Sequence, residues 1–226
     1  MSEPSPAAAP LIRIQENWLA ARERRLLSWI CARLPRSVTP DKLTLTGLVG
    51  AAMVFAGYVA SNLHSAWLLF ALAGYVVQWF GDSLDGSLAR FRKIERPSYG
   101  YFIDHSCDGL TNLLIVAGIG LSPFVTMDVA MLALAGYFLM SIHAFLSARV
   151  TGELKLSYIA AGPTELRLAL MAMTVLMLLA GPGYHLGRVG AFDAFVGAIA
   201  ALLVVLFAVQ TLIVGRRLAA QEPARN

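Results

Sequence analysis

The sequence predicts an all-α integral membrane protein in which an amphipathic interfacial helix precedes six transmembrane helices. Three observations support this fold class. First, 58% of the 226 residues are hydrophobic and only 14% are charged, whereas about a quarter of the residues of a soluble domain are charged. Second, six stretches are long and apolar enough to cross a bilayer. Third, lysine and arginine residues concentrate on one side of those stretches.

The N-terminal segment precedes the apolar stretches. Residues 1–10, MSEPSPAAAP, contain neither a positive charge nor an apolar run, so they are not a cleavable signal peptide, and we expect disorder. Residues 11–36 are predicted to form an amphipathic juxtamembrane helix, because Trp18, Trp29 and other apolar side chains share one face. Arg24 lies on the opposite face, which suits a helix in the headgroup layer. The alternative is an amphipathic helix that packs on its own protein.

Residues 37–216 are the predicted six-helix transmembrane domain, and residues 217–226 are a C-terminal tail that we expect to be disordered. A membrane-crossing helix needs about 20 mostly apolar residues. The predicted spans are 44–62, 65–90, 100–121, 125–148, 164–181 and 191–214. Short connections separate them, and residues that favour turns, such as Ser122 and Pro123, mark several of these connections.

Charge placement predicts the orientation, because basic residues near the ends of spans favour the cytoplasmic side. Of the 18 lysine and arginine residues, all but Arg188 lie before the first span, after the last, or around the connections that follow the second and fourth spans. Both termini are therefore predicted to be cytoplasmic. A multi-pass protein of a bacterial inner or plasma membrane is the expected location.

Four aspartates stand out in the stretch 81–109, GDSLDGSLARFRKIERPSYGYFIDHSCDG. Asp82 and Asp85 are three residues apart near the cytoplasmic end of the second span, and Asp104 and Asp108 are four residues apart near the start of the third. Each pair therefore shares a helix face. Helices joined by a short connection run antiparallel, so the two faces can meet. The sequence thus predicts an active site at the cytoplasmic side.

Carboxylates that converge on one site are stabilised by a bound cation. A carboxylate at mid-membrane costs on the order of 2.5–3.5 kcal/mol, and like charges also repel one another. Carboxylate oxygens favour hard ions such as Mg²⁺, Mn²⁺ or Ca²⁺. Four carboxylates exceed what one Mg²⁺ takes from a protein, so two divalent ions are expected. Paired ions of this kind serve phosphoryl chemistry by clamping phosphate oxygens.

Less specific interpretations exist for the same residues. The acids could be solvated helix ends, and Gly86, Ala89 and Gly100 could serve close helix packing alone. His105 could be a hydrogen-bonded packing residue. An ion-coupled transporter is the alternative from another functional class, because intramembrane acids also mark ion paths. Transporters tend to place their sites near the midplane between repeated halves, and the sequence has no visible repeat.

The acids and their neighbours form the pattern D-x-x-D-G-x-x-A-R followed by G-x-x-x-D-x-x-x-D, which resembles the motif of the CDP-alcohol phosphotransferase (CDP-alcohol phosphatidyltransferase) family. It comprises Asp82, Asp85, Gly86, Ala89, Arg90, Gly100, Asp104 and Asp108. Nine residues, FRKIERPSY, separate its two halves, where the family usually has eight. Six spans after an interfacial helix also match, so the resemblance covers nearly the whole chain.

The resemblance implies a phospholipid-synthesising transferase that moves a substituted phosphate group from a CDP-alcohol to a second alcohol and releases CMP. It implies two Mg²⁺ or Mn²⁺ ions bound by Asp82, Asp85 and Asp104. Asp108 would help to bind the second ion and would deprotonate the attacking hydroxyl. The family also implies a homodimer, and the expected partners are the two alcohols and membrane lipids, with no nucleic acid.

The resemblance also implies a set of substrate-binding residues. Gly86, Ala89 and Gly100 would leave room for the cytidine, and Arg90 would lie near the phosphates. The run VTPDKLTLTG is similar to the family's Pro-Asn-x-x-Thr-Leu element, with an aspartate in place of asparagine. This similarity adds Thr44 to the substrate-binding set.

Two stretches are similar to the choline and ethanolamine phosphotransferases, namely DHSCD at 104–108 and TGELKLSYIAAGPTE at 151–165. His105 is therefore a second candidate for the general base, or for a residue that orients the base. Tyr101 stands where that branch typically has glutamate.

The main prediction for the substrates is a CDP-amino-alcohol donor with a lipid acceptor such as diacylglycerol. The alternative is CDP-diacylglycerol with a small soluble alcohol such as serine, inositol phosphate, glycerol phosphate or choline. A lysine or arginine often follows the last aspartate in enzymes that use phosphorylated acceptors. Gly109 occupies that place here and argues against such acceptors.

Overall fold

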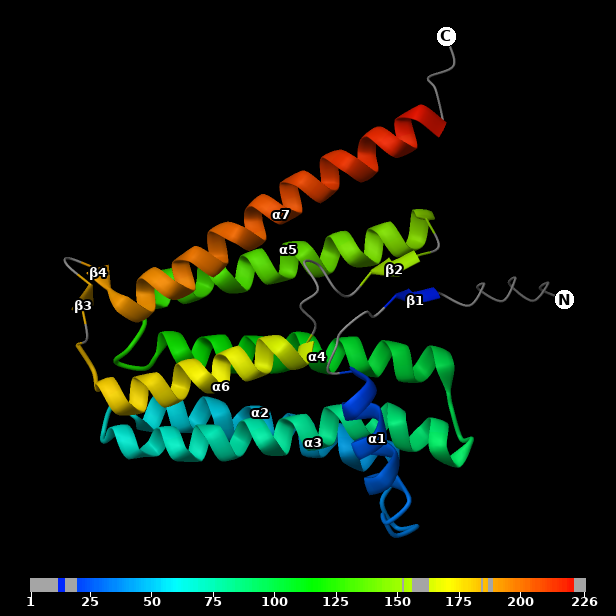
Figure 1. Cartoon of the computed structure of the whole chain (residues 1–226), viewed down its shortest axis with the longest axis horizontal. Coiled ribbons are helices and arrows are strands. Elements are labelled where there is room, and N and C mark those ends of the chain that lie inside the picture. The colour runs from blue at the N-terminus through cyan, green and yellow to red at the C-terminus, as the bar shows by residue number, and fades with distance from the viewer. Residues whose placement is uncertain are drawn as a thin grey trace, which may run out of the picture.

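The computed structural model describes residues 12–14, 20–151, 153–155, 163–183, 185–186 and 189–221. Helices dominate this part of the chain (Figure 1). They are α1 (Ala20–Cys31), α2 (Pro40–Ala60), α3 (Leu68–Arg92), α4 (Pro97–Gly120), α5 (Met127–Thr151), α6 (Pro163–Ala180) and α7 (Ala191–Gln221), with the 3-10 turn η1 (Ser65–Trp67). Two pairs of very short strands complete it: β1 (Ile12–Ile14) with β2 (Glu153–Lys155), parallel, and β3 (His185–Leu186) with β4 (Val189–Gly190), antiparallel.

Each predicted span coincides with one long helix, from α2 to α7, so the predicted helical class is confirmed. Among the described residues, three helices are long and apolar enough to cross a membrane, judged by length and composition alone: α2, α5 and α7. The aspartates of α3 and α4 make these two helices more polar than their neighbours.

The ends of the chain differ from the sequence prediction. The helix predicted over 11–36 is shorter, since α1 covers Ala20–Cys31, and a helix is wrong for Ile12–Ile14, whose backbone pairs with β2. At the other end α7 continues to Gln221, past the predicted start of the tail at 217. The disorder expected for residues 1–10 and for 222–226 lies outside the described residues, as do residues 156–162 of the stretch similar to the choline and ethanolamine enzymes.

Helices α2 and α3 pack together very closely because glycines line their contact. A Cβ atom added to Gly81 would lie 2.2 Å from the backbone nitrogen of Gly47. A Cβ atom added to Gly50 would lie 2.3 Å from the backbone nitrogen of Gln78. Small residues allow such an approach of two backbones in a membrane helix pair. The first turns of α2 are thereby held against the segment of α3 that carries the acids.

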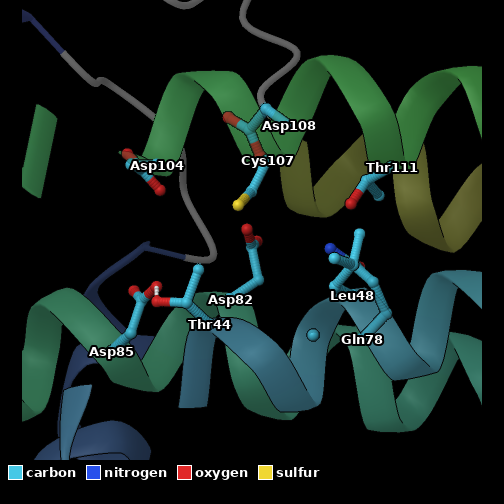
Figure 2. Close-up of a pocket in the computed structure, with 10 residues that line it drawn as sticks. Thr44, Leu48, Gln78, Asp82, Asp85, Asp104, Cys107, Asp108 and Thr111 are labelled. Atoms are coloured by element: carbon cyan, nitrogen blue, oxygen red, sulfur yellow. Dashed lines mark hydrogen bonds between the residues drawn. The ribbon is translucent and has the colours of Figure 1, made fainter. Parts of the chain in front are cut away.

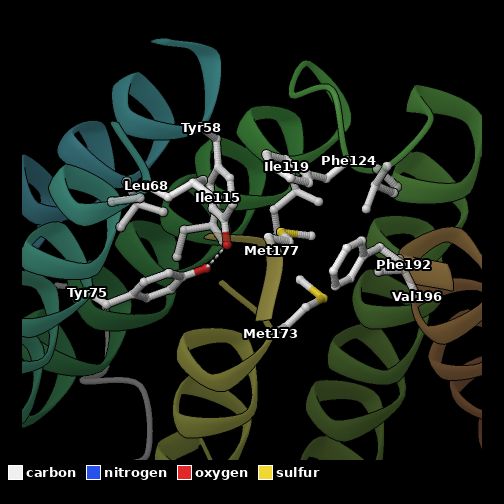
Figure 3. Packing of buried hydrophobic residues seen from close by; sticks show 14 residues of the cluster. Tyr58, Leu68, Tyr75, Ile115, Ile119, Phe124, Met173, Met177, Phe192 and Val196 are labelled. Atoms are coloured by element: carbon white, nitrogen blue, oxygen red, sulfur yellow. Dashed lines mark hydrogen bonds between the residues drawn. The ribbon is translucent and has the colours of Figure 1, made fainter. Parts of the chain in front are cut away.

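The main hydrophobic core, shown in Figure 3, uses the N-terminal half of α3, whereas Asp82 and Asp85 lie in the C-terminal half. It joins α2, α3, α4, α5, α6 and α7 through buried side chains, among them Tyr58, Tyr75, Ile119, Met177 and Phe192. The two tyrosine hydroxyls are 3.3 Å apart, and the Tyr58 hydroxyl is 2.6 Å from Thr174 Oγ1. These polar groups are therefore satisfied inside the core.

Helix α1 packs against the C-terminal half of α3. Leu27 and Cys31 of α1 pack against Leu84 and Leu88 of α3 in a second cluster. The Arg92 guanidinium also donates three hydrogen bonds to backbone carbonyls of the segment that joins α1 to α2. In Figure 1, the connection between α3 and α4 lies at the same end of the bundle as the C-terminal ends of α5 and α7. The aspartates lie close to this end.

Candidate active site

The four aspartates of the motif line one small pocket between α3 and α4 (Figure 2). Asp82 and Asp85 project from α3, and Asp104 and Asp108 project from α4 on the other side. Helix α2, which contacts both of these helices, contributes Thr44 to the pocket. The remaining lining residues are Gly47, Leu48, Gln78, Cys107 and Thr111. The arrangement matches the expectation that the two acidic faces meet.

Asp85 is held by the first turns of α2 and by its own helix. The Thr44 hydroxyl donates a hydrogen bond of 2.7 Å to Asp85 Oδ2, and the backbone N–H of Gly86 donates to Asp85 Oδ1. The structure therefore places Thr44, a predicted substrate-binding residue, in direct contact with a predicted metal ligand.

Asp82 has a partner that sequence reasoning missed. Arg167 of α6 donates from Nη2 to Asp82 Oδ2 at 2.8 Å, and from Nε to Gln78 Oε1 at 2.7 Å. The arginine side chain is only 12% exposed. An arginine inside a predicted span is itself a signal of function, because ionisable residues are rare and costly there. That signal could have identified Arg167.

His105 lies beside the pocket, between Asp104 and Asp108. Its Nδ1 atom is 3.9 Å from Asp104 Oδ2 and 3.7 Å from Asp108 Oδ2, which is too long for direct hydrogen bonds. The ring makes an edge contact with Tyr101 at 4.4 Å between centroids and packs at 5.2 Å from Phe145. Nε2 is buried, and among the described residues it has no hydrogen-bond partner.

A larger cleft of about 630 Å³ opens next to the acids and contains the other predicted substrate-binding residues. Gly86, Ala89, Arg90 and Gly100 all line it. A Cβ atom added to Gly100 would meet nothing within 4 Å, whereas one added to Gly86 would lie 3.3 Å from Arg90 Nη1. Close helix packing therefore does not require Gly100, and the absence of its side chain leaves open space in the cleft.

The mouth of the cleft carries an ion pair between α2 and the loop before α4. Arg96 pairs with Asp41, and its guanidinium carbon lies 4.0 Å from the centre of the Tyr99 ring. The hydrogen bond with Asp41 raises the pKa of Arg96 further above its ordinary value. All three residues line the cleft. The longer loop noted in the sequence thus contacts the residue that replaces the asparagine of the Pro-Asn-x-x-Thr-Leu element.

The donor set fits hard divalent cations. Asp104, His105 and Asp108 can each offer one ligand atom, and these atoms lie within 4.8 Å of one another. Asp82 and Asp85 face the same pocket from α3. A set dominated by carboxylate oxygens is typical of Mg²⁺ or Mn²⁺ sites. The part-buried position of the acids also differs from that of solvated helix ends, since the Asp82 side chain is 26% exposed and that of Asp104 is 34% exposed.

Comparison with known proteins gives one family and two kinds of relatives. The family model that matches covers residues 37–215 and is described as CDP-alcohol phosphatidyltransferase. Archaetidylinositol phosphate synthase of Methanothermobacter thermautotrophicus is 31% identical over 118 residues, which are 52% of this chain and 56% of the relative. The Pyrococcus horikoshii protein of the same name is 30% identical over 105 residues, 46% of this chain and 52% of the relative.

The second kind of relative is cholinephosphotransferase 1. The Danio rerio protein is 25% identical over 203 residues, which are 82% of this chain and 52% of the relative. The chain thus spans about half the length of these three curated relatives.

Proposed function

The chain belongs to the CDP-alcohol phosphatidyltransferase family, and we propose that it is a membrane enzyme that transfers a substituted phosphate group from a CDP-alcohol to a second alcohol. The observation that carries the proposal is the convergence of four aspartates from α3 and α4 in one pocket beside the cleft. The cleft volume of about 630 Å³ falls within the range of about 300–1,000 Å³ typical of ligand sites.

In the proposed reaction the acceptor oxygen attacks the phosphorus atom that carries the donor's alcohol. The bond from this phosphorus to the oxygen that bridges the two phosphates breaks, and CMP leaves with that oxygen. The acceptor's proton passes to a base at the pocket. The open space at Gly100 and the small residues Gly86 and Ala89, which line the cleft, leave room for the cytidine. The side chain of Arg90, which also lines the cleft, binds the phosphates.

Asp82, Asp85, Asp104 and Asp108 are the proposed ligands of two divalent cations, Mg²⁺ or Mn²⁺. When bound, such cations neutralise the pyrophosphate and stabilise the charge that develops on the leaving group. Within the protein, Thr44 fixes the orientation of Asp85 through its hydrogen bond to Oδ2. Asp85 is thereby held in the pocket that the other three aspartates also line.

Asp108 is the first candidate for the general base, and His105 is the second. We expect Asp108→Asn to retain binding of the CDP-alcohol while transfer falls by about 10²–10⁴-fold, the usual cost of losing a general base. Single-turnover rates and nucleotide binding on the same preparation separate the two effects.

If His105 is the base instead, His105→Ala shows that pattern, and Asp108→Asn mainly weakens metal binding. A near-normal rate in either variant excludes that residue as the sole base. His64→Asn is a suitable control, because His64 caps η1 and asparagine can still accept the hydrogen bond from the backbone of Ala66.

For the substrates we propose a water-soluble CDP-amino-alcohol as donor and a lipid alcohol such as diacylglycerol as acceptor. The longest of the three reported alignments is to a protein named cholinephosphotransferase 1, and it supports this pair of substrates. The cleft also carries Arg90 and Arg96, which suits a charged nucleotide. The alternative donor is CDP-diacylglycerol with a soluble alcohol, and the two relatives named archaetidylinositol phosphate synthase keep it under consideration.

A screen of donors and acceptors tests this choice. Purified protein is incubated with CDP-choline or CDP-ethanolamine plus diacylglycerol, and separately with CDP-diacylglycerol plus serine, inositol phosphate, glycerol phosphate or choline. Mass spectrometry of the lipids identifies the product. We expect phospholipid from the first group and much less from the second. Turnover with CDP-diacylglycerol alone as donor would reverse the assignment of substrates while leaving the family reaction in place.

The same proposal includes a topology. Helices α2 to α7 form six spans in a catalytic domain of residues 37–216, α1 lies at the cytoplasmic interface, both termini are cytoplasmic, and the enzyme is a homodimer of a bacterial inner or plasma membrane. In Figure 1, the α3–α4 connection and the C-terminal ends of α5 and α7 lie at the same end of the bundle. This arrangement supports the proposed orientation. An ion-coupled transporter, the remote alternative, would not release CMP from CDP-alcohols.

A further inference from the structure

We propose that Arg167 of α6, anchored by Gln78 of α3, is a positioning residue that fixes the Asp82 carboxylate for binding of a divalent cation. The inference rests on the metal site of the proposed function. It adds a residue from outside the aspartate motif and from a different helix, 85 positions further along the chain than the aspartate that it contacts.

The Arg167 side chain bridges two acceptors of α3, the Asp82 carboxylate and the Gln78 amide. Nη2 of Arg167 donates to Asp82 Oδ2 at 2.8 Å, and Nε donates to Gln78 Oε1 at 2.7 Å. Gln78 is 4% exposed, so its amide is fixed by the surrounding protein. The planar guanidinium presents its donors in a rigid fork, and this shape lets one side chain serve both acceptors at defined angles.

Arg167 acts from behind the carboxylate. Asp82 and Gln78 line the acidic pocket, and Asp82 also lines the cleft, whereas Arg167 is among the lining residues of neither. The guanidinium donates to Oδ2, and the proposal assigns cation binding in the pocket to Oδ1. Partners that orient a metal ligand in this way typically contribute 10–100-fold to metal affinity.

The backbone of α6 is itself fixed on both sides of Arg167. The Thr164 hydroxyl donates to the Glu23 carboxylate of α1, and that carboxylate also accepts from Trp79 Nε1 at 3.0 Å. Two turns beyond the arginine, Thr174 Oγ1 lies 2.6 Å from the Tyr58 hydroxyl in the core. The position of the guanidinium is thus defined by α1, α2 and α3 together. Its positive charge also offsets repulsion among the four acids before a cation binds.

Binding of Mn²⁺ to the full-length protein in detergent, followed by electron paramagnetic resonance, tests the inference without any turnover. Arg167→Lys keeps the positive charge, but a single ammonium group lacks the rigid two-armed geometry. We expect Mn²⁺ affinity to fall by about 10-fold or more. Gln78→Met changes no charge and little volume, and it should weaken binding in the same direction. Because both variants break one bridge, the double variant should be less impaired than independent effects would predict.

Ser122→Ala is the control, since it removes a buried hydroxyl from the connection between α4 and α5, in neither the acidic pocket nor the cleft. It should lower the melting temperature while Mn²⁺ affinity stays at the wild-type value. Wild-type affinity in both Arg167→Lys and Gln78→Met overturns the inference but leaves the proposed function intact. If Arg167→Lys does not fold, the affinity of Gln78→Met decides. Absence of Mn²⁺ binding by the folded wild-type protein would instead overturn the metal site, and this inference with it.

Discussion

Replacement of Asp82, Asp85 or Asp104 by asparagine is expected to lower the rate of CMP release by at least about 100-fold. The amide has nearly the shape of the carboxylate but lacks its charge, so it binds a divalent cation beside the phosphates much more weakly. Loss of a single electrostatic donor at a transition state already costs about 10²–10³-fold. Steady-state CMP release at saturating Mg²⁺ measures the effect, and thermal unfolding of the same preparations verifies that the variants are folded.

Asp128→Asn serves as the control for these variants. Asp128 lies in the first turn of α5, in neither the acidic pocket nor the cleft, so its replacement should leave the rate unchanged. A folded Asp82→Asn, Asp85→Asn or Asp104→Asn protein with wild-type turnover would exclude that aspartate as an essential ligand.

Removal of divalent cations is expected to abolish activity, and addition of Mg²⁺ or Mn²⁺ should restore it. Without cations, four carboxylates around one pocket would repel the pyrophosphate of the donor. The measurement is CMP release before and after addition of excess EDTA, followed by titration with each cation.

EDTA already saturated with Mg²⁺ is the control for this experiment, because it contains the chelator without depleting the metal. Equal inhibition by both forms of EDTA would mean that the chelator acts on something other than the metal site. Full activity in metal-free EDTA would rule out the two-cation proposal.

Much of the helix bundle could be predicted because each long helix depends mainly on the residues of its own segment. Six apolar stretches predicted the positions of α2 to α7, and the spacing of the aspartates predicted which faces of α3 and α4 meet. The roles of individual glycines could not be predicted in this way. Gly81 is required by backbone contact with Gly47, whereas Gly100 borders open space, and only the packed structure distinguishes these two cases.

Features that depend on contacts between residues far apart along the chain could not be predicted from the sequence. Residues Ile12–Ile14 fit an amphipathic helix when taken alone, but they pair with Glu153–Lys155 far along the chain. Arg167 is unusual as a charged residue inside a predicted span, but its contact with Asp82 becomes visible only when α6 is placed against α3. The packing of His105 between Tyr101 and Phe145 likewise joins two helices.

Release of CMP from a CDP-alcohol by the purified protein tests the central claim most directly. With Mg²⁺, CDP-ethanolamine or CDP-choline, and diacylglycerol in detergent micelles, we predict CMP and phospholipid in equal amounts. We also predict that omission of the acceptor or replacement of Asp82 by asparagine suppresses both products. Failure of the folded wild-type protein to release CMP from any CDP-alcohol, including CDP-diacylglycerol with soluble acceptors, would contradict the account.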